Sequence, residues 1–460
     1  MTAAASSTAV RPAAWPLAQG GAVLRVQRAP DAGDGVAAAI ERDLETLATG
    51  AGLTLGAAGA SAAVRLAGPA EPGGAPRRLA ASTLRAGLDE LADDPRTRDA
   101  LASGLLVLDP DPGIVTTTLQ ALCGARPGPA AVALVRGADD PPGGWDRPLF
   151  DAGYVRLKPG AAAVIAEPAD AYLRSDLLTD LGLLREPSSA NAISMQTLGQ
   201  NGRFANQLWQ YGFLWLYGLR NNCRIQTPRW VGNLLYGVPA EPPDPSFTRQ
   251  AFTVFTGVER HLWSMAEPPV NVDFFGYFQE IPESWRRHRQ LLRRLFTPQP
   301  GFVDLIERWF KRSVPSGATL VGIHVRRGDY SYFDHTAVPW FRPIPIEWYD
   351  TFLEELWPTL ERPALFVATD DAATVGPHFA RYDPILAPSS EIAIPEFAFM
   401  PDFMGMQRSH VLAMVNSSFS RMAGLLADDG QVAYLPNMKT QRFERYAPWH
   451  EEDFWSRFEA

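Results

Sequence analysis

One apolar run constrains the fold more than any other feature of this chain. Residues 320–325 are apolar apart from His324, and Arg326 and Arg327 follow directly. A continuous apolar run of this length, in place of an alternating pattern, is typical of a parallel strand that helices bury on both faces. The run therefore predicts an α/β fold in which charged side chains stand at the end of a buried strand.

Aromatic residues divide the chain into two parts of different character. Of its 13 Trp, 12 Tyr and 24 Phe, only Trp15 and Trp145 precede Phe150. A length of 460 residues allows two to four domains at about 100–200 residues per domain. Short β-like runs before Phe150, with helix-like stretches at 35–48 and 81–91, predict a small α/β module.

The same reading divides the first part of the chain into three segments. We expect a disordered terminus over residues 1–20, which are rich in Ala, Ser and Pro. An accessory α/β module over 21–157 and a linker over 158–190 follow. From residue 191 the composition is that of a larger α/β enzyme.

Charge and cysteine content narrow the class of protein. The net charge of −9 argues against a broad basic surface for nucleic acid. No apolar run is long enough to span a membrane, and the first residues do not read as a secretory signal. Cys123 and Cys223 fit no disulfide framework or metal pattern and are expected to be small buried hydrophobes. These features favour a cytoplasmic protein.

The first candidate site is a glycine-containing loop that leads into a helical pattern. Gly199 and Gly202 precede apolar residues at helical spacing, and Asn206 lies in the first turns of the expected helix. Glycines let a backbone approach a ligand, and a helix start exposes unpaired N–H groups. The alternative is that Asn206 and Gln207 bond only to neighbouring backbone.

The second candidate site follows the buried run of residues 320–325. Arg326 and Arg327 present two adjacent guanidinium groups, whose forked donors suit the oxygens of a diphosphate. The alternative is a solvated basic turn in which Asp329 pairs with an arginine. His324 is either a ligand contact or a buried core histidine.

Two further candidate sites also follow expected strands. Asp370 and Asp371 end an apolar run, and their carboxylates would accept N–H groups of guanine or a ribose hydroxyl. A metal pair and a helix N-cap are the alternatives for these two residues. Asn416, Ser417 and Ser418 precede a helical pattern and would form a phosphate site, with ordinary N-capping as the alternative.

These positions obey one rule of open α/β sheets. Ligands bind beyond the carboxyl ends of the strands. The last three motifs each follow an expected strand, with cations for phosphate and carboxylates for the nucleoside. Together they predict a site for a nucleoside diphosphate.

The second motif also resembles the signature of a known enzyme family. His324, Arg326, Arg327, Asp329 and Tyr330 resemble the H-x-R-R-x-D-Y signature of the α-1,2-fucosyltransferases (glycosyltransferase family 11), which α-1,6-fucosyltransferases share in part. The resemblance is therefore to the fucosyltransferase superfamily.

The other motifs are similar to that superfamily in order and spacing. Residues 416–420 are similar to its N-S-S-F-S motif, and Asp370 and Asp371 match its acidic pair. Residues 202–207 are similar to its G-N-Q motif and closer still to the G-R-F-G-N-Q of protein O-fucosyltransferases. The resemblance covers about residues 191–445 and leaves the first 190 unexplained.

The resemblance implies a fold and a reaction. The fold is GT-B, with an acceptor-side lobe over 191–318 and a donor lobe over 319–460 that ends in a C-terminal helix. The donor is GDP-β-L-fucose, the reaction inverts the anomeric carbon, and no cofactor or metal is required.

The resemblance also implies roles for the candidate residues. Arg326 would contact the donor diphosphate, Asn206 would approach the reacting centre, and Asp329 is a candidate base or a group that orients Arg326. The donor-binding set is His324, Arg326, Arg327, Asp370, Asp371, Asn416, Ser417 and Ser418.

Two positions depart from the family pattern. Ala205 stands where the family usually has Gly, and Arg421 and Met422 replace tandem aromatic residues. Both departures flank the expected site, so they indicate a different acceptor, a changed donor preference or a loss of activity.

We expect a bacterial, cytoplasmic fucosyltransferase of polysaccharide biosynthesis that forms an α-1,2 linkage to galactose. Its partners would be a GDP-sugar and a glycan acceptor, a lipid-linked one included. The alternatives are protein O-fucosylation, another GDP-sugar, or an inactive sugar-nucleotide or glycan-binding protein.

Residues 285–296 form an amphipathic helical pattern with five arginines. A solvated helix is one interpretation of this pattern. The other is a patch for an anionic glycan or lipid carrier, which would bring the protein to the inner face of the membrane.

Overall fold

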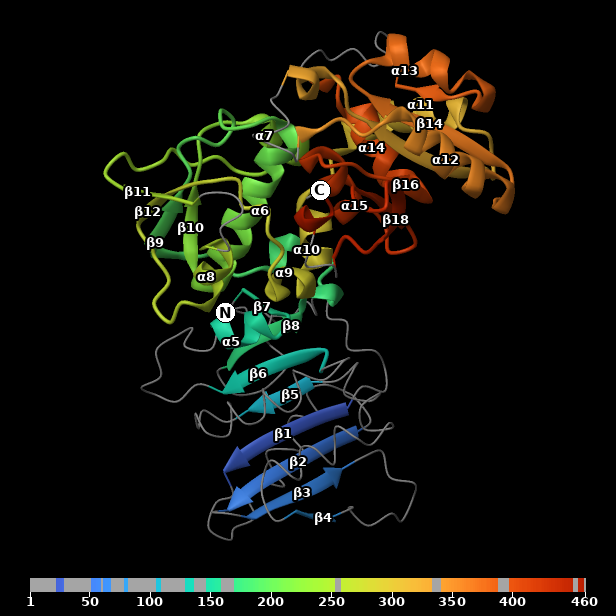
Figure 1. Cartoon of the computed structure of the whole chain (residues 1–460). Coiled ribbons are helices and arrows are strands. Elements are labelled where there is room, and N and C mark those ends of the chain that lie inside the picture. The colour runs from blue at the N-terminus through green and yellow to red at the C-terminus, as the bar shows by residue number, and fades with distance from the viewer. Residues whose placement is uncertain are drawn as a thin grey trace, which may run out of the picture. The chain divides into compact units, whose positions relative to one another are not determined.

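The computed structural model describes twelve stretches of the chain (Figure 1). They are residues 22–28, 51–58, 61–67, 78–81, 105–108, 129–135, 146–158, 169–252, 258–332, 341–387, 397–449 and 454–458. The chain forms two compact units, one of Met1–Asn191 with Tyr217–Arg224 and one of Ala192–Leu216 with Ile225–Ala460. Residues 1–20, the helix-like stretch at 35–48, residues 82–91 of the second such stretch, and Cys123 lie outside the described residues. Ala81, the first residue of that second stretch, is the end of a strand.

The first unit contains an eight-stranded sheet in the order β4-β3-β2-β1-β5-β6-β8-β7. Its central strands β2, β1, β5 and β6 are parallel, and antiparallel strands flank them at both edges. Its elements are β1 (Ala22–Arg28), β2 (Ala51–Ala58), β3 (Ser61–Ala67), β4 (Arg78–Ala81), β5 (Leu105–Leu108), β6 (Ala131–Val135), α5 (Asp146–Asp151), β7 (Tyr154–Arg156) and β8 (Ala169–Arg174).

The linker predicted for residues 158–190 differs from the structure. Strand β8 lies within this stretch and pairs antiparallel with both β6 and β7. Ala171, Tyr172 and Leu173 are buried in the middle of β8. This part of the stretch therefore belongs to the first unit, because β8 lies between β6 and β7 in the sheet and its apolar side chains are part of the core.

The second unit contains two lobes, and the first is built on a four-stranded sheet in the order β10-β9-β12-β11. Strands β9 and β11 both pair parallel with β12. The elements are β9 (Ser188–Ser194), α6 (Phe204–Asn221), β10 (Cys223–Gln226), α7 (Val231–Tyr236), β11 (Thr248–Ala251), α8 (Val258–Ser264), β12 (Val272–Phe275), α9 (Glu283–Arg287) and α10 (Arg289–Leu295). Of these, the start of β9 up to Asn191 and the residues Tyr217–Arg224 group with the first unit. Cys223 is a buried free cysteine, as predicted.

The second lobe contains a six-stranded sheet in the order β15-β14-β13-β16-β17-β18. All neighbouring strands are parallel except β17 and β18. The strands are β13 (Thr319–Val325), β14 (Pro363–Thr369), β15 (Ile385–Leu386), β16 (Val411–Ala413), β17 (Val432–Asn437) and β18 (Arg442–Tyr446). Taken in chain order, this is the doubly wound arrangement, whose direction of winding reverses between β13 and β16.

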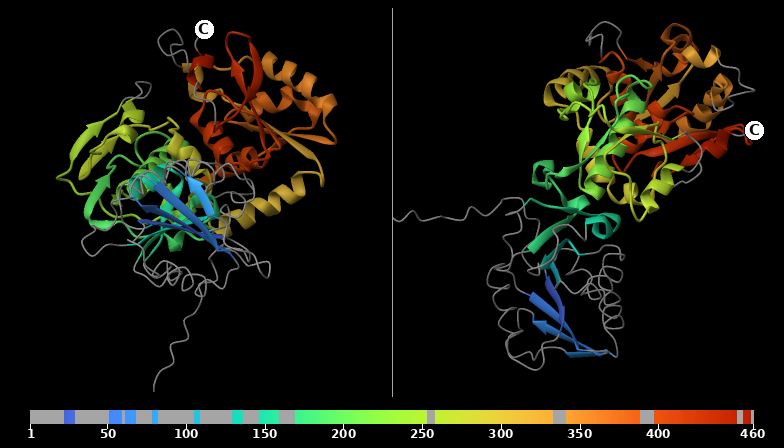
Figure 2. Two further views of the ribbon diagram at one scale, coloured as in Figure 1. Left: turned by 90° about the horizontal axis from the view of Figure 1, so that it is seen from below. Right: turned by 90° about the vertical axis from the view of Figure 1, so that its left-hand side faces the viewer.

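Helices pack against this sheet (Figure 2). They are α11 (Pro300–Ser313), α12 (Ile346–Leu356), α13 (Ala372–His378), α14 (Met400–Arg408) and α15 (Ser418–Leu426). Phe310 of α11 and Gly405 of α14 contact Phe366 of β14, while Phe352 of α12 contacts Phe443 of β18. Residues 320–325 are therefore enclosed, and every one of them is buried.

The predicted α/β fold of the GT-B type, with two Rossmann-like lobes after an N-terminal α/β module, is confirmed. The C-terminal helix is limited, in the described residues, to the 3-10 helix η9 (Trp455–Phe458). The long helix expected at 285–296 is interrupted at His288, which separates α9 from α10. In the described part of the chain, no helix combines the length and the apolar character needed to cross a membrane.

Replacing Gly405 should destabilise the second lobe. A Cβ at Gly405 would lie 2.3 Å from the ring of Phe366, so we expect Gly405→Ala to lower the melting temperature, with an overpacking cost of about 1–3 kcal/mol. Gly301→Ala is the matched control, because a Cβ there meets no atom within 4 Å. Equal melting temperatures for the two variants in a thermal melt would contradict this packing.

Candidate active site

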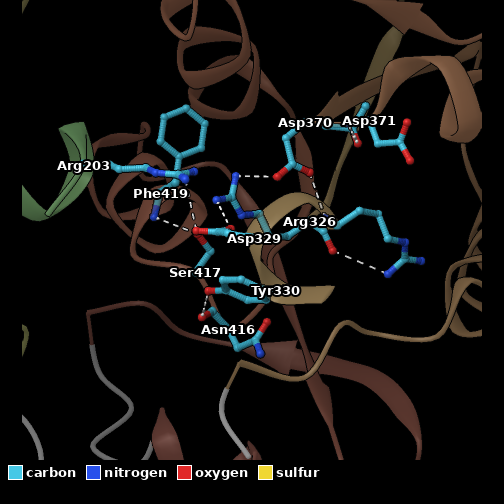
Figure 3. Close-up of polar contacts among 11 residues, drawn as sticks. Arg203, Arg326, Asp329, Tyr330, Asp370, Asp371, Asn416, Ser417 and Phe419 are labelled. Carbon is cyan, nitrogen blue, oxygen red and sulfur yellow. Dashed lines mark hydrogen bonds and ion pairs between the residues drawn. The ribbon is translucent and has the colours of Figure 1, made fainter. Parts of the chain in front are cut away.

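Arg326 follows β13 directly and lies between two carboxylates (Figure 3). Its Nη1 is 2.7 Å from Oδ2 of Asp370, and its Nη2 bonds to Asp329. Its guanidinium also lies 5.4 Å from the ring centre of Tyr330. The side chain is only 16% exposed, so these contacts hold a cation in one position at the carboxyl end of the sheet.

Arg327 does not share these partners through its guanidinium. Its Nη1 donates a hydrogen bond of 2.7 Å to the carbonyl of Ile344, and its backbone N–H donates to Oδ1 of Asp370 at 2.8 Å. The sequence predicts two adjacent guanidinium groups that grip one diphosphate. In the structure Arg326 is held by Asp329 and Asp370, while Arg327 is bonded to a loop carbonyl.

Asp370 organises the turn after β13. Its Oδ2 forms an ion pair with Arg326, and its Oδ1 accepts a hydrogen bond from the backbone N–H of Arg327. Gly328 lies so close that a Cβ there would be 2.2 Å from Oδ2 of Asp370. A side chain at this position would therefore displace the carboxylate that holds Arg326.

Asp371 has a different environment from its neighbour. It is the N-cap of α13, and its Oδ1 accepts a hydrogen bond from the backbone N–H of Thr374 at 3.3 Å. Of the alternatives weighed for the acidic pair, the N-cap is therefore the contact that the structure shows for Asp371. Among the described residues, no cluster of three or more His, Cys, Asp or Glu is arranged to hold a metal ion.

Asp329 connects the two lobes. It lies in the 3-10 helix η4 (Gly328–Tyr332), bonds to Arg326, and its Oδ2 is 3.1 Å from Nη2 of Arg203 in the first lobe. Of the two roles considered for Asp329, these contacts favour the orientation of arginine over general-base catalysis.

His324 is a buried core histidine by its environment. Burial first, and the charge of Arg326 second, lower its pKa to about 3, so the ring is neutral at physiological pH. Its Nδ1 has no hydrogen-bond partner among the described residues, and its ring lies 5.8 Å from that of Phe419. A neutral ring at the end of β13 is available as a hydrogen-bonding group but does not supply charge.

The motif at residues 416–418 lies beside the turn after β13, which contains Arg326 and Arg327. Tyr330 donates a hydrogen bond of 2.9 Å to the carbonyl of Asn416. Ser417 is the N-cap of α15, and its Oγ accepts a bond from the backbone N–H of Phe419 at 3.3 Å, while Ser418 begins the helix. The capping alternative for Ser417 is thus present, and capping places the N-terminus of α15 next to Arg326 and its partners (Figure 3).

Asn206 lies in the first turn of α6 and is partly buried. Its Oδ1 accepts a hydrogen bond of 2.8 Å from Nε2 of Gln279. Gly202, with a positive φ of 84°, approaches it closely, because a Cβ there would be 2.6 Å from Nδ2 of Asn206. Gln207 donates to the carbonyl of Gly202 at 3.2 Å, so the backbone contact weighed for this motif is made by Gln207.

Aromatic rings from both lobes meet beside the site. The ring of Phe204, at the start of α6, lies 4.2 Å from that of Phe399 and 5.1 Å from that of Phe403 in the second lobe. Phe403 lies 5.3 Å from Phe419, next to the start of α15. This cluster brings the glycine loop of the first lobe to the start of α15 in the second.

Asp402 is a site residue that the motifs did not indicate. It lies in the first turn of α14, and burial first and the charge of Asp370 second raise its pKa to about 7. A third carboxyl group therefore lies close to the partners of Arg326 and changes charge near neutral pH. Its sequence signal is a single acidic residue within the otherwise apolar stretch 397–406.

No protein-family profile and no curated protein matches this sequence. Among solved structures, the chain is similar to the fucosyltransferase NodZ from Bradyrhizobium (14% identity, TM-score 0.37, covering 54% of this chain and 96% of that chain). It is also similar to a mutant of Arabidopsis thaliana FUT1 in complex with GDP (11% identity, TM-score 0.38, covering 58% of this chain and 76% of that chain). A third similar structure is POFUT1 in complex with GDP-fucose (11% identity, TM-score 0.36, covering 55% of this chain and 99% of that chain). These likenesses are too weak to define the fold, which the strand order defines.

The raised pKa of Asp402 predicts a pH-dependent stability. The folded protein holds this carboxyl in its neutral form, so its contribution to stability is present below about pH 4 and is lost as the pH rises through about 7. We expect Asp402→Asn to raise the melting temperature at pH 8 and to change it much less at pH 5.

The control for this prediction is Asp304→Asn, on the exposed surface of α11. This variant should leave the melting temperature nearly unchanged at both pH values. A gain from Asp402→Asn that is equal at pH 5 and pH 8 would mean that the effect is not due to ionisation of Asp402.

Proposed function

We propose that this protein is a glycosyltransferase of the fucosyltransferase superfamily that uses GDP-β-L-fucose as its donor. The observation that carries the proposal is the convergence of three motifs at one sheet edge. Arg326 after β13, Asp370 after β14 and the helix start at Ser417 after β16 lie together, where the winding of the sheet reverses. Open α/β sheets bind nucleotides at this position.

The proposed chemistry uses the cation that the site already holds in place. Glycosyl transfer passes through an oxocarbenium-like state while negative charge builds on the leaving group. Arg326 uses two of its five N–H donors on Asp329 and Asp370, so others are available to the leaving phosphate. The N–H groups at the start of α15 add positive potential. Fixed donors stabilise the developing charge without reorganisation.

The first lobe supplies the acceptor side in this proposal. Gly202 lies in the loop before α6, and Asn206 lies in the first turn of this helix. The ion pair between Arg203 and Asp329 connects this region to the donor side. Holding donor and acceptor together between two lobes adds the proximity contribution to catalysis. We propose an inverting transfer to a glycan hydroxyl, with the α-1,2 linkage to galactose as the specific form and no metal requirement.

One departure from the family pattern has a structural role. Arg421 is buried, donates a hydrogen bond of 2.9 Å to the carbonyl of Gln279, and lies 5.0 Å from the ring centre of Trp209. It therefore joins the second lobe to the first. A contact of this kind does not require a loss of catalysis, so the altered residue is compatible with an active enzyme.

Nucleotide binding is the first test of this proposal. We expect calorimetry without added metal to show binding of GDP and little binding of UDP or ADP. Arg326→Ala should weaken GDP binding by about 10- to 100-fold, since a hydrogen bond to a charged group contributes about 1.5–3 kcal/mol. Arg442→Ala, which removes an exposed ion pair with Glu355, is the control and should bind GDP normally.

Equal affinity for the three nucleotides would sink the donor assignment. If GDP binds selectively, turnover of GDP-fucose with galactose-terminated glycans and with peptide acceptors separates the glycan reaction from protein O-fucosylation. Selective GDP binding without any turnover supports the alternative of an inactive binding protein.

A chelator tests the proposed independence from metal. We expect transfer from GDP-fucose to continue in EDTA, because Arg326 and the start of α15 supply the positive charge beside the leaving group. The rate of GDP release is the measurement. Loss of activity in EDTA that a divalent cation restores would contradict this prediction.

A further inference from the structure

A pocket in the first unit lies outside the motifs of the proposed donor site. It is formed by α5, β7, β8, the segment before β9 and the residues 218–222 that group with this unit. Its charged and aromatic wall includes Asp146, Phe150, Arg156, Tyr172 and Arg185.

One arginine of the pocket is fully engaged by neighbouring acids. Arg156 lies 3.2 Å from Oδ2 of Asp146 and 2.5 Å from Oδ1 of Asp170, and both the arginine and the two carboxylates are largely buried. Tyr172 donates a hydrogen bond of 2.8 Å to Asp146. The acids of this wall are therefore bonded to Arg156 and Tyr172.

A second arginine, Arg185, lines the same wall and has no acidic partner among the residues that the structure describes. The backbone N–H of Arg185 donates to the carbonyl of Arg156 at 3.0 Å, and Leu157 and Leu184 form the adjoining antiparallel bridge. The Nη1 of Arg185 is buried and has no hydrogen-bond partner among the described residues. A buried, unsatisfied donor of a charged group is costly, and an anion would satisfy it.

The pairing within the pocket leaves Arg185 as the arginine that is not bonded to an acid among the described residues. Burial raises the pKa of the Asp146 carboxyl more strongly than Arg156 lowers it. Asp146 and Asp170 are both bonded to Arg156, and a guanidinium group stays charged at physiological pH, so Arg185 can still bind an anion.

We propose that this pocket binds the carboxylate or phosphate group of a small organic anion, with Arg185 as the binding side chain. The planar fork of a guanidinium fits either group through two parallel hydrogen bonds. The ring of Phe150 provides an apolar wall for the part of the ligand that carries the anion. This site is independent of the proposed donor site, so it does not rest on the proposed function.

The test is calorimetry on the full chain at constant ionic strength. The probes are inorganic phosphate, glucose 1-phosphate, glucuronate and, as the uncharged comparison, glucose. We expect one saturable site for at least one of the anions and no binding of glucose. Preference for glucuronate or for the two phosphates identifies which anionic group the pocket takes.

Variants then locate the site. Arg185→Gln should weaken anion binding about 10-fold or more, and Arg185→Lys, which keeps the charge but loses the fork, should give an intermediate affinity. Arg174→Gln on β8 is the control in the same unit, because Arg174 pairs with Asp176 outside the pocket. It should bind as the unchanged protein does.

A second control separates this pocket from the donor site. Arg326→Ala should retain binding of the anion even where it loses GDP. Two results would overturn the proposal. One is that no anion binds at a single site, and the other is that binding persists in folded Arg185→Gln but disappears in Arg326→Ala.

Discussion

The ion pairs of Arg326 with Asp329 and Asp370 are the interaction on which the candidate active site depends. They join the end of β13, the following 3-10 turn and the end of β14 into one unit. Removing one member of a largely buried pair leaves an uncompensated charge, which is far more costly than the pair's net contribution to stability. The same contacts hold the cation ready for a ligand, and Gly328 makes them possible because it has no side chain.

Contacts between the lobes form a second constraint on the site. Phe204 inserts its ring beside Phe399 and Phe403, while Arg421 reaches the carbonyl of Gln279. These contacts flank the glycine loop on one side and the start of α15 on the other. These contacts align the start of α6 with the start of α15. A substitution of Arg421 would therefore change the alignment of the two lobes as well as the local packing.

The candidate site could be predicted where a residue's role depends on its position along a strand. A continuous apolar run marks a buried parallel strand. In the structure Arg326 and Asp370 follow two such strands, at the sheet edge where open α/β sheets bind ligands. The hydrogen-bond partner of each site residue was harder to predict from the sequence. Asp371, for example, caps α13, and this contact depends on the local backbone geometry. The sequence analysis missed Asp402 because this residue comes close to Asp370 only when α14 packs on the sheet.

The sequence by itself determined the α/β class, the buried strand at residues 320–325 and the set of charged residues at strand ends, since apolar periodicity is a local property of the chain. The tertiary structure decided which charges pair. It assigned Arg326 to two carboxylates, bonded Arg327 to a loop carbonyl and left Arg185 beside Arg156 in the first unit. These outcomes depend on distances between segments far apart in the chain, which sheet pairing and helix packing set and which no local pattern encodes.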